Sequence, residues 1–178
     1  HFGLAGPGAI FGHAVHLTKR ERAAIRDSGS AIAHCPTSNT FIGSGLFDMQ
    51  GLRDTDARIP VGLATDVAGG SSLSMFATMR TAYEIAQLRG YSLHPAKAWH
   101  LATVGSATAM RIADKVGNLA PGMEADLIII DLTSTNLIRR RVARAENIWE
   151  VLFAQMILAD DRAIAATYVA GEPVYRQD

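Results

Sequence analysis

The sequence has few of the features that mark several classes of protein. It contains a single cysteine, Cys35, which excludes an internal disulfide framework and a cysteine-rich zinc module. No apolar run approaches the roughly 18 residues that a membrane-spanning helix needs. Lysine and arginine (17) balance aspartate and glutamate (17), so there is no excess of basic residues for a nucleic-acid surface. We therefore expect neither a membrane nor a nucleic-acid partner.

The N-terminal residues also lack a signal-peptide pattern, because no basic region precedes an apolar stretch there. This feature and the single cysteine predict a cytoplasmic location. The sequence begins with His1 rather than methionine, inside what reads as the end of a helix. We expect it to be part of a longer polypeptide.

What the sequence does contain is a repeated order of apolar strand and helix. Apolar residues make up 48% of the chain, enough for a sizeable core. Three short apolar runs predict strands, and helical patterns follow them; a loop is expected at 36–45. The predicted strands are 9–13, 30–34 and 60–66, and the predicted helices begin at Thr18, near 46 and near 72. This order predicts an α/β fold with a parallel sheet and helices outside it.

The pattern changes after the third unit. Ser92 is expected to cap a helical stretch that runs to about 112, and a strand is expected within 117–131. A helix from about Ala145 and a C-terminal hairpin complete the expected elements. The predicted organisation is therefore one part at 1–112 and a strand-rich part with a helix at 113–178.

Each of the three predicted strands ends in a polar residue that could perform chemistry. These residues are His13, His34 and Asp66. The carboxyl ends of parallel strands lie at one edge, where enzymes of barrel type carry their active sites. A carboxylate buried there, such as Asp66, is costly unless a cation compensates it, and a neutral imidazole can bind a metal or transfer a proton.

Structural interpretations stay open for all of these residues. Asp66 could instead cap the next helix, and His13 could be a core histidine bonded to the backbone. His34 is expected to shape a pocket wall, and Cys35 to be an inert small residue beside the pocket. From the residues alone, a metal site and a purely structural arrangement both remain compatible with the sequence.

Three segments resemble the last barrel units of the amidohydrolase superfamily. They are FGHAVHL, IAHCPTSNTFIGSGLFDM and VGLATDVAGGSSLSMFATMRTAYEIAQLRG. Together with ILADDRAIAATYVAGEPVY near the end, they are most similar to guanine deaminases, whereas GNLAPGMEADLIIIDL is shared more widely in the superfamily.

The resemblance implies the C-terminal part of a (β/α)8 barrel, about three βα units, with strands of a small β-sandwich. It implies one divalent ion, zinc, with Fe²⁺ as the alternative. By residue, Asp66 maps onto the metal-ligating aspartate of the eighth strand and His13 onto the catalytic histidine of the sixth. Asp66 is thus expected to be catalytic as well as a ligand, and Asp66 and His34 are the candidates for the substrate pocket.

The implied reaction is hydrolytic deamination of guanine to xanthine and ammonia by a metal-activated water, in a full-length enzyme expected to be a homodimer. The sequence departs from the family pattern, since it has no HxH pair and no fifth-strand histidine followed by glutamate. The chain alone is therefore expected to be inactive. The alternatives are an adenosine or S-adenosylhomocysteine-type deaminase, a triazine chlorohydrolase, or a fragment without activity.

Overall fold

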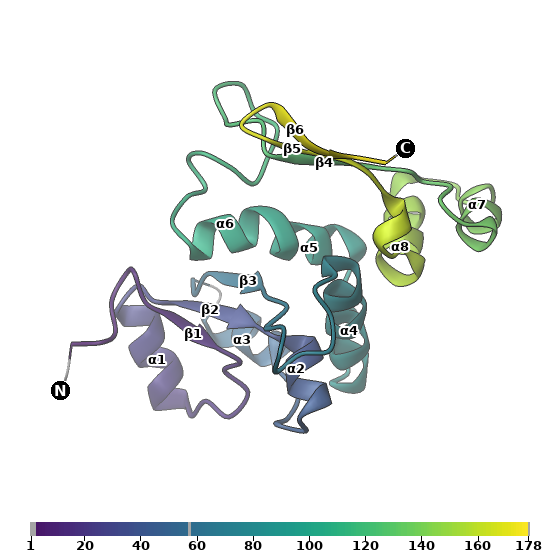
Figure 1. The fold of residues 1–178 in the computed structure, drawn as a ribbon. Coiled ribbons are helices and arrows are strands. Elements are labelled where there is room, and N and C mark those ends of the chain that lie inside the picture. Colours follow the sequence, from purple (N-terminus) through teal and green to yellow (C-terminus); the bar gives the residue numbers. More distant parts are fainter. Residues whose placement is uncertain (1–2, 57, 178) are drawn as a thin grey trace.

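The computed structural model describes residues 3–56 and 58–177, which form two three-stranded sheets and a set of helices (Figure 1). The strands are β1 (Ile10–Gly12), β2 (Ala31–His34), β3 (Val61–Leu63), β4 (Leu127–Ile130), β5 (Ile164–Val169) and β6 (Glu172–Arg176). The helices are α1 (Lys19–Asp27), α2 (Pro36–Phe41), α3 (Met49–Asp56), α4 (Met75–Leu88), α5 (Pro95–His100), α6 (Ser106–Ala109), α7 (Asn136–Val142) and α8 (Ile148–Leu158). A π-helical turn (Leu101–Gly105) joins α5 to α6, and a 3₁₀ turn (Asp161–Ala163) precedes β5. Among the described residues, no helix is both long and apolar enough to cross a membrane.

The first sheet is parallel, as predicted, with the strand order β1-β2-β3. Helices separate its strands in the chain, beginning with α1, whose start is fixed by the predicted capping box. The Thr18 side chain accepts a hydrogen bond from the Glu21 amide, and the Glu21 carboxylate accepts one from the Thr18 amide. Because all three strands run the same way, their carboxyl ends lie at one edge of the sheet.

Residues 36–41 form the helix α2, so the prediction of a loop there was wrong. Pro36 is the first residue of this helix, where its fixed φ suits helical geometry and its missing N–H costs nothing. The Thr40 hydroxyl donates to the Pro36 carbonyl and so satisfies a backbone group of the first turn. The short polar run therefore forms a helix that begins directly after β2.

A second group of helices packs on the first sheet through a very close contact at Gly62 of β3. The run from α5 through the π-helical turn to α6 lies between the two sheets (Figure 1). The Ser106 hydroxyl is within hydrogen-bonding distance of the Leu63 carbonyl (3.1 Å) and the Leu101 carbonyl (2.9 Å). A Cβ atom on Gly62 would lie only 2.7 Å from the Ser106 Cα, so glycine permits this packing.

Gly62→Ala is expected to lower the free energy of unfolding by roughly 1–3 kcal/mol, because a backbone atom, not a flexible side chain, blocks the new methyl group. Urea denaturation of the two proteins would measure the difference. Gly12→Ala is the matched control, since Gly12 lies in β1 of the same sheet and its Cβ would meet no atom within 4 Å. Equal stability of the Gly62 and Gly12 variants would contradict this packing argument.

The second sheet, β4-β5-β6, is antiparallel and lies on the other side of α5 and α6 (Figure 1). Its hairpin was predicted, and Ala170 and Gly171 turn the chain with φ angles of 50° and 82°.

Two details of the surrounding helices differ from the prediction. His94, not Ser92, caps α5, and α7 forms before Ala145, where no helix was predicted. The Thr135 side chain caps α7 and its apolar Ile138 is fully buried, which accounts for this helix.

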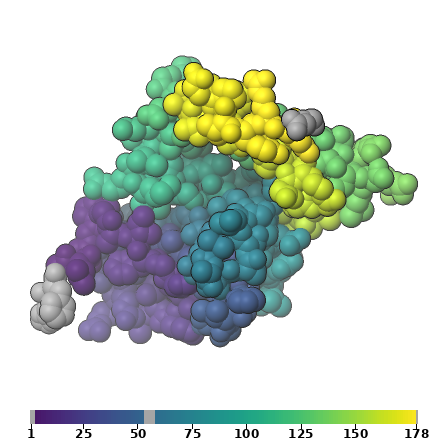
Figure 2. Space-filling view, viewed as in Figure 1, coloured from purple at the N-terminus to yellow at the C-terminus, as the bar shows by residue number. Residues whose placement is uncertain are grey.

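The core is continuous across these elements. Helix α8 packs against α4 and α5, and its Met156 belongs to the same buried cluster as Ile32 of β2 and Met79 of α4. The space-filling view shows the C-terminal strands as a layer over the helices, with the surface hollowed beneath it (Figure 2). This hollow is an apolar groove of about 880 Å³ between α4, α5, α6 and the second sheet.

Candidate metal centre

The carboxyl edge of the first sheet brings together His13, Cys35 and Asp66. One potential ligand atom from each of these residues lies within 4.8 Å of the other two. The His13 Nε2 and Asp66 Oδ2 atoms are 3.7 Å apart, and the two side chains are 41% and 40% exposed. Two of the three predicted strand-end residues therefore meet at a site that solvent can reach.

The backbone on both sides of this site adopts an unusual conformation. His13 and Ala14 follow β1 with φ angles of 65° and 54°, and Asp66 and Ala68 follow β3 with 46° and 92°. Residues other than glycine adopt positive φ at a cost of order 1–3 kcal/mol, and such residues cluster at functional sites. The His13 amide donates to the Ala33 carbonyl of β2, which holds the first of these turns against the sheet.

The absence of a side chain at Gly69 leaves room for the Asp66 carboxylate. A Cβ atom at this position would lie 3.1 Å from Asp66 Oδ2 and 2.9 Å from the Ser38 hydroxyl. The glycine-rich sequence after Asp66 thus lets the loop fold over its own carboxylate, next to α2. A side chain at position 69 would crowd the Asp66 carboxylate and the Ser38 hydroxyl.

Cys35 is buried, and its thiol donates to the Ala33 carbonyl at 3.3 Å. Burial raises the pKa of this thiol, and the nearby Asp66 charge raises it further, although a hydrogen bond from the His13 backbone acts in the opposite direction. The thiol is therefore protonated and unreactive by itself, as expected for an inert residue beside the site. Its position as a third possible donor atom next to His13 and Asp66 was not predicted.

His34 lies in a different environment from the other two strand-end residues. Its ring is fully buried and stacks on Phe47 with 4.4 Å between ring centroids. Burial lowers the pKa of His34 to about 3, and its Nδ1 atom has no hydrogen-bond partner. Consecutive residues at a strand end point to opposite faces, so Cys35 rather than His34 lies beside His13 and Asp66. A role for His34 in the substrate pocket stays a prediction.

Two further buried polar residues next to this site were not singled out from the sequence. They are Ser38 and Asn39 of α2, both fully buried, and each has a side-chain atom, Ser38 Oγ and Asn39 Nδ2, without a hydrogen-bond partner. The signal that could have found them is their place directly after a strand, in a polar run inside an apolar region.

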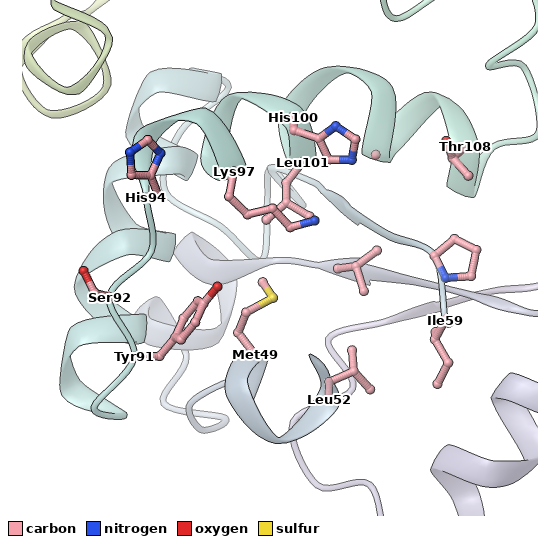
Figure 3. Close-up of a pocket in the computed structure, with 13 residues that line it drawn as sticks. Met49, Leu52, Ile59, Tyr91, Ser92, His94, Lys97, His100, Leu101 and Thr108 are labelled. Carbon is pink, nitrogen blue, oxygen red and sulfur yellow. The ribbon is translucent and has the colours of Figure 1, made fainter. Parts of the chain in front are cut away.

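A second hollow lies at the opposite end of β3, away from the candidate metal centre. It has a volume of about 570 Å³ and is lined by the amino end of β3, by α3 and by α5 (Figure 3). Lys97, His94 and His100 lie around apolar side chains such as Leu52 and Leu101 in this view. Since neither His13 nor Asp66 lines it, this hollow is separate from the strand-end chemistry.

The donor atoms at the carboxyl edge suit a divalent ion. Imidazole nitrogen and carboxylate oxygen are ligand types that zinc accepts, and the Cys35 thiol would have to lose its proton to become a third. Two ligands, each about 2.1 Å from one zinc ion, can be at most about 4.2 Å apart, and the 3.7 Å between His13 Nε2 and Asp66 Oδ2 satisfies this limit. The residues present therefore fit a zinc ion, although three protein ligands at most are available among the described residues.

Parallel strands whose carboxyl ends carry histidine and aspartate around a candidate ion site are typical of metal-dependent hydrolases. The comparison with known families agrees with this class. The chain belongs to the amidohydrolase family, whose model matches residues 2–174.

Individual relatives show which enzymes of this family the chain resembles. The chain is 38% identical over 177 residues to the guanine deaminase of Escherichia coli, a match that covers 99% of this chain and 40% of that protein. A solved structure of E. coli guanine deaminase superposes with a TM-score of 0.95 at 39% identity, with the same two coverages. An adenosine deaminase from Xanthomonas campestris with bound zinc superposes with a TM-score of 0.80 at 27% identity, covering 96% of this chain and 38% of that one. The chain thus spans about 40% of the length of these relatives.

Proposed function

We propose that this chain is the C-terminal part of a guanine deaminase, which hydrolyses guanine to xanthine and ammonia. The observation that carries the proposal is the meeting of His13 and Asp66 at one sheet edge, in a chain 38% identical to a guanine deaminase. In this reaction the water oxygen bonds to the ring carbon that bears the amino group. The carbon–nitrogen bond breaks, and the nitrogen leaves as ammonia after gaining a proton.

Asp66 and His13 have distinct roles in this proposal. Asp66 would hold a divalent ion and would accept a proton from the attacking water, for which its partly exposed carboxylate is suitably placed. His13 hydrogen-bonds that water through Nε2, the ring nitrogen that lies nearest to Asp66. A zinc ion, when bound, would supply the acidity of the site, since it lowers the pKa of water to about 7. Zinc is supported by the donor set and by the zinc bound in the X. campestris relative.

The proposal extends to the fold of the whole enzyme. The units around β1, β2 and β3 would be the last three of a (β/α)8 barrel, and residues 1–112 would form this part with its following helices. Residues 113–178 would supply strands and a helix of a small β-sandwich domain. The parallel order of the first sheet and the separate antiparallel second sheet support this division.

A second candidate is an adenosine-type deaminase, which the X. campestris relative favours. Both enzymes replace an amino group on a purine by oxygen, so the same strand-end residues would serve either reaction. Guanine and adenosine assayed side by side with the complete enzyme would decide between the two. Turnover of adenosine without turnover of guanine would overturn the guanine assignment.

The 178-residue chain alone is expected to release no ammonia from guanine, because the proposed roles assign only Asp66 as a metal ligand here, whereas a catalytic zinc usually has three protein ligands. Ammonia release by this chain and by a polypeptide of the relatives' full length, each supplied with zinc, would be compared in the same assay. Steady turnover by the shorter chain would show that the catalytic machinery lies entirely within it.

A further inference from the structure

A short side-chain hydrogen bond at the candidate site joins His13 to a residue that the proposed mechanism does not use. His13 Nδ1 lies 2.8 Å from Asn39 Oδ1, although the two residues are 26 positions apart in the sequence. Asn39 is a fully buried residue of α2, whereas His13 is partly exposed at the end of β1. The contact therefore connects the carboxyl edge of the first sheet to the buried side of helix α2.

Several bonds hold Asn39 and its helix in this place. The Asn39 backbone N–H donates to the Cys35 backbone carbonyl, and the Asn39 backbone carbonyl accepts from the Ser44 backbone N–H, both at 2.9 Å. The Ser44 hydroxyl also lies 3.3 Å from Asn39 Oδ1, so that oxygen accepts from two directions. Helix α2 is fixed in turn to the loop that carries Asp66, because the Thr37 hydroxyl donates to the Thr65 carbonyl at 3.1 Å.

This geometry decides which nitrogen of His13 carries the proton. An amide oxygen can only accept hydrogen bonds, so His13 Nδ1 must be the protonated nitrogen when it faces Asn39 Oδ1. In the neutral ring Nε2 then has a free lone pair, and this is the nitrogen 3.7 Å from the Asp66 carboxylate. Without such a partner, a neutral histidine side chain in water favours the opposite tautomer.

We propose that Asn39 is a positioning residue, which fixes His13 as the Nδ1–H tautomer and holds Nε2 toward Asp66 as an acceptor. The effect of Asn39 on catalysis rests on the proposed function, whereas its effect on the His13 tautomer is independent of that function. The arrangement is costly for folding alone, since Asn39 Nδ2 is left buried without a partner and His13 keeps a φ of 65°. Such costs are typical of groups that orient catalytic side chains.

The tautomer can be read directly by nitrogen-15 NMR of the 178-residue chain at about pH 8.5, well above the ordinary histidine pKa of about 6.5. We expect His13 to show a protonated Nδ1 and an unprotonated Nε2. A protonated Nε2 would mean that the Asn39 amide is reversed, and it would overturn the proposal without any mutation. Because no substrate is involved, this result stands or falls separately from the guanine assignment.

Two substitutions extend the test. Asn39→Leu removes the acceptor at similar size and is expected to shift His13 to the Nε2–H tautomer, whereas Asn39→Asp keeps an acceptor and should keep the original tautomer. In the complete enzyme, Asn39→Leu should lower kcat about 10–100-fold with little change in KM, and Asn39→Asp should recover part of the loss. An unchanged tautomer in the leucine variant, or a change confined to KM, would contradict a positioning role.

Discussion

Replacing Asp66 by asparagine is expected to lower guanine turnover by the complete enzyme more than 100-fold and to reduce its zinc content. Loss of residues that merely orient metal ligands typically costs about 10–100-fold, so loss of a ligand should cost more. Asparagine is the appropriate replacement because Asp66 has a φ of 46°, a conformation that asparagine tolerates better than alanine does. The variant should therefore fold normally while it lacks the charge that the ion requires.

The measurement combines steady-state turnover with metal analysis of the purified protein. Asp27→Asn is the matched control, since Asp27 is an exposed carboxylate at the end of α1 and pairs only with the neighbouring Arg26 in the bonds described. That variant should keep full activity and zinc content. Near-normal turnover and zinc binding by the Asp66 variant would remove Asp66 from the ligand set and with it the basis of the proposed function.

His34 is expected to make the chain unstable in mild acid. Burial lowers the pKa of this histidine from its ordinary value of 6.5 to about 3. Between these two pH values, His34 is protonated in the unfolded chain but neutral in the folded chain. The contribution to stability is thus complete above pH 6.5 and is lost as the pH falls from 6.5 toward 3. One proton of difference changes the free energy of unfolding by roughly 1.4 kcal/mol per pH unit, or roughly 2.7 kcal/mol over two units.

Urea denaturation of the wild type and of His34→Phe, between pH 7 and pH 4.5 at about half-unit steps, would isolate this effect. Phenylalanine keeps a ring against Phe47 but cannot be protonated. We expect the stability curves of the two proteins to diverge as the pH falls, with the wild type losing more. His94→Asn is the control, because His94 is an exposed cap of α5 and its replacement should leave the wild-type pH dependence intact. Parallel curves for the wild type and His34→Phe would show that His34 is protonated in the folded protein.

Local sequence signals predicted much of the fold because they act over a few residues. The Thr18–Glu21 capping box and the Ala170–Gly171 turn each depend on neighbours in the chain, and both are present. The failures have an equally local cause. The run that begins at Pro36 was interpreted as a loop, yet Pro36 is the first residue of α2, and a proline is compatible with both a loop and the first turn of a helix.

The candidate site was predictable only in part. His13 and Asp66 could be expected to meet, since both follow strands of one parallel sheet and such strands end at a common edge. The burial of the strand-end side chains could not be predicted, because it depends on the face of the sheet toward which each side chain points. For this reason His34 was singled out as a pocket residue, whereas Cys35 is the one that lies beside the other two.

The sequence by itself determined the order of the strands and of most helices, the polar residues at the strand ends and the likeness to amidohydrolases, because each of these is encoded in short contiguous segments. Only the tertiary structure decided the 3.7 Å approach of His13 to Asp66 and the bond from His13 to Asn39. Those distances follow from strand register, from the backbone turns after β1 and β3 and from the docking of α2. All three depend on packing between residues far apart in the chain, which no local pattern specifies.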